Sequence, residues 1–193
     1  MELGTRASEF RTEWDSEVGQ AFLLTGRPGV GKTTVVRAVA DRLGGRAGGF
    51  YTEEIRERGR RTGFRLVALD GPAGTLASVK GPGRHRVGKY AVHLDELDQV
   101  GVAALWRAID GPGVEVVVVD EIGKMELFSP AFRQAVLAAL EGPKPVLATV
   151  MARPQPWVDD IRARPDATLV EVTLDNRQAL PDRVWRWLEG VWA

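Results

Sequence analysis

Eight residues near the N-terminus limit the folds open to this chain more than any other feature. Residues 26–33 read Gly-Arg-Pro-Gly-Val-Gly-Lys-Thr and match the pattern G-x-x-x-x-G-K-[ST] at every fixed position. The apolar segment 21–25 before them predicts a strand, and the periodic apolar residues at 35–43 predict a helix. A glycine-rich turn between a strand and a helix directs backbone N–H groups toward an anion. The sequence therefore predicts a phosphate-binding loop.

The residue types in this loop indicate what each would do with a nucleotide. Lys32 is expected to reach the β- and γ-phosphates, and the Thr33 hydroxyl is expected to ligate Mg²⁺. The predicted nucleotide-binding residues here are Gly26, Arg27, Pro28, Gly29, Val30, Gly31, Lys32, Thr33 and Thr34. The alternative, a glycine-rich turn that contains Lys-Thr by chance, does not account for the strand and helix on either side.

A second feature is the β-branched run at 114–119, which ends in Asp120-Glu121. A run without alternation is typical of a strand covered on both faces. Ligands of open α/β sheets lie at the carboxyl ends of the strands, so Asp120 is predicted to hold the Mg²⁺. Glu121 is predicted to orient a water for attack on the γ-phosphate. The alternative interpretation is a solvated loop that begins with two charges.

Three further side chains are weaker candidates. Lys124 follows the acidic pair and either supplies a cation to the transition state or is a surface lysine. Thr149 is the polar residue of the apolar run 146–150 and either contacts the γ-phosphate or the attacking water, or bonds within a sheet. Arg153 follows this run and could face the phosphates.

Charge and composition exclude several function classes. The chain has 26 basic and 26 acidic side chains, which argues against bulk nucleic acid or an anionic membrane as the main partner. It has no cysteine, which excludes a disulfide framework, a thiolate zinc site and a cysteine nucleophile. No apolar run approaches the roughly 18 residues of a membrane span, and we expect a cytoplasmic protein. Arginines cluster at 56–65 and again at 84–89, either as a solvated face or as the source of an arginine finger.

The 193 residues predict one domain over 20–193, preceded by a polar leader or tail at 1–19 that we expect to be disordered. Strands and helices alternate, which predicts an α/β fold with a mostly parallel sheet. The short connection between the expected strands at 48–56 and 62–69 requires an antiparallel hairpin. Residues 71–89 are expected to be loop, and a helix is expected over 95–109 with Asp95 as its N-cap.

Several segments together resemble a known family, the small P-loop nucleoside-triphosphatases first described in thermophiles, whose animal members are called cancer-related nucleoside-triphosphatase. The resemblance rests on the segments Leu23–Thr34, Gly49–Glu54, Arg60–Phe64, Arg86–Tyr90, Val119–Phe128 and Asn176-Arg177. Their order and spacing agree from about residue 21 to the C-terminus. The segments at 49–54 and 120–127 are more specific than the loop, because phosphate binding alone does not require them.

This resemblance implies a three-layer P-loop NTPase fold and Mg²⁺-dependent hydrolysis of ATP, GTP, CTP and UTP to diphosphates. It also adds Arg177 to the candidate nucleotide-binding residues. Two other functions stay open at this point. The same loop serves nucleotide or small-molecule kinases, and the basic hairpin would suit a nucleotide-regulated switch that binds RNA or a protein. Nucleic-acid binding is weakly supported, because aromatic residues are not interleaved with the arginines.

Overall fold

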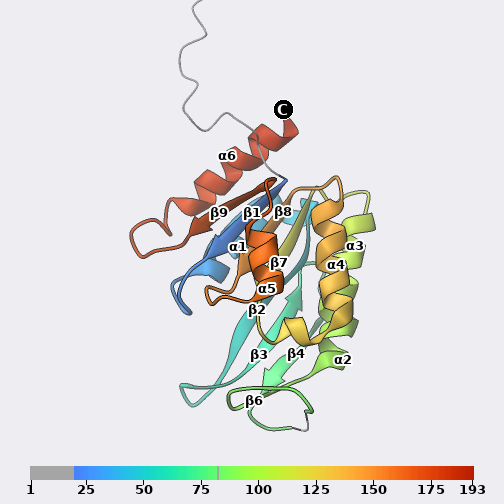
Figure 1. Ribbon diagram of the computed structural model, residues 1–193, viewed down its shortest axis with the longest axis vertical. Coiled ribbons are helices and arrows are strands. Elements are labelled where there is room, and N and C mark those ends of the chain that lie inside the picture. Colours follow the sequence, from blue (N-terminus) through green and yellow to red (C-terminus); the bar gives the residue numbers. More distant parts are fainter. Residues whose placement is uncertain (1–19, 82) are drawn as a thin grey trace, which may run out of the picture.

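The computed structural model describes residues 20–81 and 83–193 (Figure 1). The prediction of a disordered leader over residues 1–19 lies outside these described residues. Over the described residues, none of the helices is both long enough and apolar enough to cross a membrane.

One mixed sheet forms the centre of the described part of the chain, with its nine strands in the order β5-β6-β4-β3-β2-β7-β8-β1-β9. The strands are β1 Ala21–Thr25, β2 Ala47–Glu57, β3 Arg60–Ala68, β4 Ala73–Ser78, β5 Arg86–Val87, β6 Tyr90–Val92, β7 Val116–Ile122, β8 Val146–Val150 and β9 Ala167–Glu171. The pairs β2–β7, β7–β8, β8–β1 and β1–β9 are parallel. The pairs from β2 through β3, β4 and β6 to β5 are antiparallel. The predicted parallel sheet with an antiparallel hairpin is confirmed, and the antiparallel part extends beyond one hairpin.

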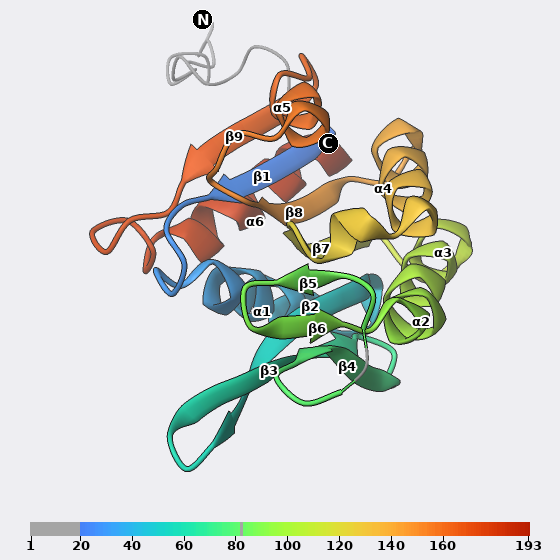
Figure 2. The same cartoon turned by 60° about the horizontal axis from the view of Figure 1, so that its bottom comes forward.

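Helices cover both faces of the sheet, which gives three layers (Figures 1 and 2). The helices are α1 Lys32–Leu43, α2 Leu94–Glu96, α3 Ala103–Asp110, α4 Pro130–Glu141, α5 Pro156–Arg162 and α6 Leu180–Trp192. Strand β1 shows how alternation serves both layers. Phe22 and Leu24 pack in the core with α1 and α6, whereas Ala21 and Leu23 pack in the core with α3 and α4.

The topology brings the two predicted motifs to the same edge of the sheet. The phosphate-binding loop follows β1, and Asp120-Glu121 lies near the end of β7, which includes both residues. Strand β8 lies between β1 and β7 and is parallel to both. The carboxyl ends of all three strands therefore meet at one site.

Two expectations from the sequence are wrong. Residues 71–89 are not all loop, because β4 pairs with β3 and β6, and the short β5 pairs with β6. The residue that precedes the helical segment is His93 rather than Asp95, and it makes no side-chain cap. The segment then continues as a π-helical stretch, Leu97–Val102, which buries Leu97, Val100, Gly101 and Val102.

The N-terminus of α4 agrees with the sequence pattern. Ser129 caps it by accepting a hydrogen bond from the Phe132 N–H at 3.0 Å, and Pro130 occupies the first helical position. The cap fixes where the chain turns after β7, and so it also limits the path of residues 123–128.

Candidate active site

The phosphate-binding loop has the backbone conformation that its glycines allow. Gly26, Gly29 and Gly31 have φ values of 138°, 77° and 114°. A Cβ on Gly26 would lie 2.7 Å from the carbonyl oxygen of Val172, so any side chain there would collide with backbone. Gly31 precedes α1, and no side chain caps this helix. The first amides of a twelve-residue helix are therefore available to an anion.

Lys32 lies across the mouth of this loop. Its Nζ donates to the carbonyl oxygen of Gly26 at 3.1 Å and lies 3.9 Å from Oε2 of Glu121. The Lys32 side chain is only 9% exposed, whereas that of Glu121 is 32% exposed. A buried ammonium next to free helix amides forms a positive site for a phosphate group.

A bulge in β7 brings the two acidic residues to this cation. Val119 pairs with Ala148 of β8, but the next recorded pair is Ile122 with Val150, so β7 has one extra residue between the two pairs. In a regular strand, successive side chains would point to opposite faces. The bulge instead allows both carboxylates to approach Lys32.

Asp120 is almost completely buried and is held by polar partners. Its Oδ1 accepts from the Thr149 hydroxyl at 2.6 Å, and its Oδ2 accepts from the Thr52 N–H at 3.4 Å. Burial raises the pKa of Asp120, while hydrogen bonds from Thr149, Thr33 and the Thr52 backbone and the charge of Lys32 oppose this rise. The carboxylate is thus enclosed but provided with donors.

The other two carboxyl groups of this segment differ in exposure. Burial raises the pKa of Glu121, the Lys32 charge lowers it and the Asp120 charge raises it further. Glu126 begins a short 3-10 turn, η3 Glu126–Phe128, and is 4% exposed. Burial, followed by the charges of Glu121 and Asp120, raises the pKa of Glu126 to about 8, against hydrogen bonding from the backbone of Glu126 and Gly123.

The donor set fits a hard divalent cation that is shared with a substrate. Within residues 20–81 and 83–193, no group of three or more His, Cys, Asp or Glu side chains forms a metal cage. Mg²⁺ is typically held by one or two protein oxygens together with phosphate oxygens and waters. Asp120 and Thr33, which hydrogen-bond at the end of the loop, provide such a pair of oxygens.

A family model described as NTPase matches residues 21–185 of this chain. The chain belongs to this family. It is 44% identical to nucleoside-triphosphatase THEP1 from Thermotoga sp. (strain RQ2) over 163 residues, which are 84% of this chain and 92% of that protein. It is 43% identical to the human cancer-related nucleoside-triphosphatase over 176 aligned positions, and the match covers 83% of this chain and 93% of that protein.

Two solved structures of this NTPase family have the same fold. The crystal structure of THEP1 from the hyperthermophile Aquifex aeolicus superimposes with a TM-score of 0.80 and 38% identity, covering 88% of this chain and 99% of that one. The solution structure of a human cancer-related nucleoside triphosphatase gives a TM-score of 0.73 and 42% identity, covering 86% of this chain and 96% of that one. The P-loop NTPase fold expected from the sequence is confirmed.

The remaining side chains predicted for the site differ in the contacts that they make. Thr149 is buried, and its hydroxyl bonds Asp120. Arg177 donates to the carbonyl oxygen of Val30 at 3.3 Å, and its Cδ would lie 3.4 Å from a Cβ on Gly31, so it lies against the loop. Lys124 and Arg153 are exposed, and neither makes a hydrogen bond or ion pair with another residue in the described part of the chain.

Two arginines of the β2–β3 hairpin bind partners within the hairpin and its neighbours. Arg56 and Arg61 both pair with Glu54, and Arg61 also donates to the Tyr90 hydroxyl at 3.0 Å. Arg177, in contrast, donates to the phosphate-binding loop at Val30.

Sequence reasoning missed two contributors to the site. The Thr52 amide could not be predicted from residue type, because the backbone N–H of any residue at that position of β2 would bond Asp120 equally well. Glu126 could have been found, since it is a charged residue inside a segment more specific than phosphate binding requires.

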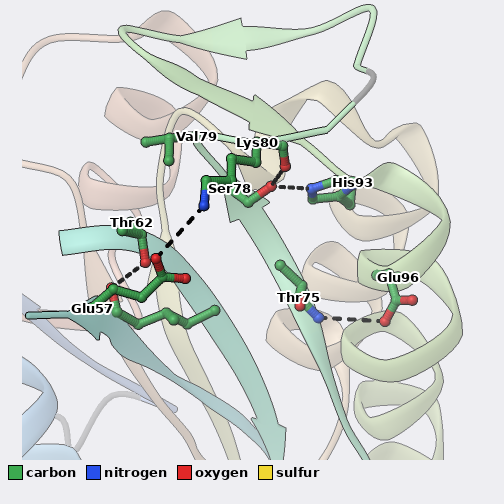
Figure 3. Close-up of a pocket in the computed structure, with 9 residues that line it drawn as sticks. Glu57, Thr62, Thr75, Ser78, Val79, Lys80, His93 and Glu96 are labelled. Atoms are coloured by element: carbon green, nitrogen blue, oxygen red, sulfur yellow. Dashed lines mark hydrogen bonds and ion pairs between the residues drawn. The ribbon is translucent and has the colours of Figure 1, made fainter.

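A separate cavity of about 400 Å³ lies on the antiparallel part of the sheet (Figure 3). Residues of β2, β3, β4 and the start of the α2 segment line it. Its walls include the ion pair between Lys80 and Glu57 at 3.8 Å and a hydrogen bond of 2.9 Å between Ser78 Oγ and His93 Nε2. None of the residues predicted for the nucleotide site lines this cavity.

Proposed function

We propose that this chain catalyses Mg²⁺-dependent hydrolysis of nucleoside triphosphates to diphosphate and inorganic phosphate, with ATP, GTP, CTP and UTP as substrates. Membership of the NTPase family and the names of its relatives support the reaction. The observation that carries the proposal is the approach of Lys32 Nζ to Glu121 Oε2 at 3.9 Å. A phosphate-binding cation and a partly exposed carboxylate are together where a γ-phosphate and its attacking water would have to meet.

In this mechanism the phosphate-binding loop and Lys32 hold the β- and γ-phosphates. Bound Mg²⁺ would neutralise the charge that develops on the phosphate oxygens, and Asp120 and Thr33 are the residues that would hold it. Glu121 accepts a hydrogen bond from a water molecule. This bond orients a lone pair of the water oxygen toward the γ-phosphorus, in line with the leaving diphosphate.

Slow turnover is part of the proposal. An arginine that reaches the γ-phosphate typically accelerates related enzymes by about 10³–10⁵-fold. Arg177 bonds the loop at Val30, and the hairpin residues Arg56 and Arg61 are paired with Glu54. We therefore expect a low rate in the isolated protein.

The test is phosphate release from each of the four nucleotides with Mg²⁺ and no acceptor, in the wild type and in Glu121→Gln. We expect slow release from all four in the wild type. In the variant we expect an ATP dissociation constant close to the wild-type value and a large loss of release, because glutamine has nearly the same shape but is uncharged and has only one acceptor oxygen with which to orient the water. Wild-type release by Glu121→Gln would contradict the role given to this residue.

The same assay separates the rival functions. Tight nucleotide binding without phosphate release until an acceptor is added would identify a kinase. Binding without release under any condition, together with salt-dependent RNA affinity, would identify a nucleotide-regulated switch. The cytoplasmic location stays a prediction.

A further inference from the structure

Glu126 is a buried acid that the proposed reaction does not use. It is 4% exposed, and it forms no ion pair with the residues described by the structure. A carboxyl group without a counter-ion is costly to bury. A group retained under these conditions beside a catalytic segment is a candidate for a role in that segment.

The carboxyl group of Glu126 accepts hydrogen bonds from the backbone of the turn that follows β7. The backbone of Gly123 and of Glu126 itself hydrogen-bonds this carboxyl group. The same turn is closed on its other side by the Leu127 N–H, which donates to the carbonyl oxygen of Gly123 at 3.2 Å. Residues 123–127 therefore form a compact turn around the Glu126 side chain.

This turn lies directly against Glu121. A Cβ on Gly123 would lie 3.0 Å from Oε2 of Glu126 and 3.5 Å from Oε1 of Glu121, so both carboxyl groups approach one side of Gly123. Ile122, which lies between Glu121 and Gly123 in the chain, is fully buried. Its carbonyl oxygen accepts a hydrogen bond from the Met151 N–H at 3.2 Å. Because Ile122 is fixed in this way, the shape of the turn that packs against Glu121 determines where the Glu121 carboxyl group lies.

We propose that Glu126 is a positioning residue for Glu121: it holds the turn after β7 in the shape that directs the Glu121 carboxylate toward the water. This inference rests on the proposed function, in which Glu121 orients that water. Glu126 itself contacts neither nucleotide nor water in this role.

Because the Glu126 carboxyl group is mostly neutral, glutamine is the conservative substitution at this position. Its pKa of about 8 leaves the carboxyl group mostly neutral at pH 7, so it does not repel Glu121 strongly. Glutamine is neutral, has the same length and can accept the same backbone hydrogen bonds. Leucine fills a similar volume but accepts none of them.

The experiment compares Glu126→Gln, Glu126→Leu and Glu121→Gln in the full chain with Mg²⁺ and ATP. Val136→Ala is the control, because Val136 is fully buried on α4 and its truncation lowers stability without reaching the turn. For each variant, kcat and KM are measured well below the melting temperature, and the dissociation constant of ADP is measured separately.

We expect Glu126→Leu to lower kcat by about 10²-fold, the scale of a misplaced catalytic group, while KM and the ADP dissociation constant change less than about threefold. Glu126→Gln should restore most of kcat, and Val136→Ala should keep it. A purely structural role would not separate kcat from KM in this way, and it would reduce kcat in Val136→Ala as well.

The outcomes separate this inference from the function on which it rests. Loss of hydrolysis in Glu121→Gln with wild-type kcat in Glu126→Leu would overturn the role of Glu126 alone. Equal losses of kcat in Glu126→Gln and Glu126→Leu would also overturn it, because the hydrogen-bonded turn would then not be what matters. Wild-type hydrolysis in Glu121→Gln would instead overturn the function proposed for Glu121.

Discussion

The Nζ atom of Lys32 lies 3.9 Å from Oε2 of Glu121, although the two residues come from different motifs, one at the start of α1 and the other near the end of β7. This ammonium lowers the pKa of the Glu121 carboxyl, against the effect of burial. Lys32 thus has two expected effects, one on the phosphate group and one on the charge of the carboxylate that we propose to orient the water.

The first prediction concerns Lys32→Met. We expect kcat/KM for ATP to fall by about 10²–10³-fold, the usual cost of removing one preorganised electrostatic group. Without this cation the pKa of Glu121 should rise further. The pH–rate profile of any residual activity should therefore shift to higher pH. The measurements are steady-state phosphate release and its pH dependence. Lys80→Met removes an exposed lysine of the antiparallel part and should leave both unchanged.

A second prediction concerns the partner of Asp120. Thr149→Val removes the hydroxyl that donates to Asp120 Oδ1 at 2.6 Å and leaves a buried oxygen without that donor. We expect a loss of unfolding free energy of about 1–3 kcal/mol and a higher Mg²⁺ concentration for half-maximal hydrolysis. Denaturant unfolding and a Mg²⁺ titration of phosphate release measure the two effects.

Thr168→Val on the edge strand β9 is the matched control for this variant. It makes the same chemical change at a distance from Asp120 and should not alter the Mg²⁺ requirement. An unchanged Mg²⁺ requirement in Thr149→Val would show that the Thr149 hydroxyl has no part in preparing Asp120.

The third prediction compares two glycines of the phosphate-binding loop. Both Gly26 and Gly29 have positive φ values, so alanine is strained at either position. A Cβ on Gly26 would also collide with the Val172 carbonyl oxygen, whereas a Cβ on Gly29 would meet nothing within 4 Å. We expect Gly26→Ala to lower the melting temperature clearly more than Gly29→Ala, as measured by calorimetry. Equal shifts would mean that the backbone conformation alone sets the cost.

The fourth prediction is a pH dependence of stability due to Glu126. Its pKa rises from the ordinary value of 4.5 to about 8 on folding, so the folded state binds its proton more tightly than the unfolded state. Below about pH 4.5, Glu126 is protonated in both the folded and the unfolded state, so its titration does not lower the free energy of unfolding. As the pH rises from there to about 8, the folded state loses stability, on the order of 5 kcal/mol at most.

Glu126→Gln does not titrate and isolates this effect. Its melting temperature should rise relative to the wild type as the pH increases from 5 to 9, even though Asp120 and Glu121 still titrate in both proteins. The two proteins are compared by thermal unfolding across this range. A constant difference would show that Glu126 does not change its protonation in the folded state.

The elements predicted best from the sequence are those with a strong local pattern. The apolar strand β1 and the valine-rich strand β7 follow directly from their apolar patterns. Strand β4 was missed, because Ala73, Gly74 and the preceding Pro72 resemble a loop. It forms through hydrogen bonds to β3 and β6, which are partners that a local pattern does not reveal.

The same distinction holds for the site. Lys32, Asp120 and Glu121 could be predicted from motifs, because their chemistry requires those residue types. The bulge that turns both acidic residues toward Lys32 depends on the register between β7 and β8, which the sequence does not specify. The burial of Glu126 likewise depends on how the turn after β7 packs.

The partners of Asp120 come from distant parts of the chain, since the Thr52 amide belongs to β2 and the Thr149 hydroxyl to β8. During synthesis on the ribosome, the phosphate-binding loop is complete more than a hundred residues before Thr149 is added. Strand β1, which leads into this loop, pairs with β8 and β9, so the loop lacks its neighbours in the sheet until both strands have been made. The anion site and the last hydrogen-bond donor to Asp120 should therefore form together, late in synthesis, when β8 pairs with β1 and β7.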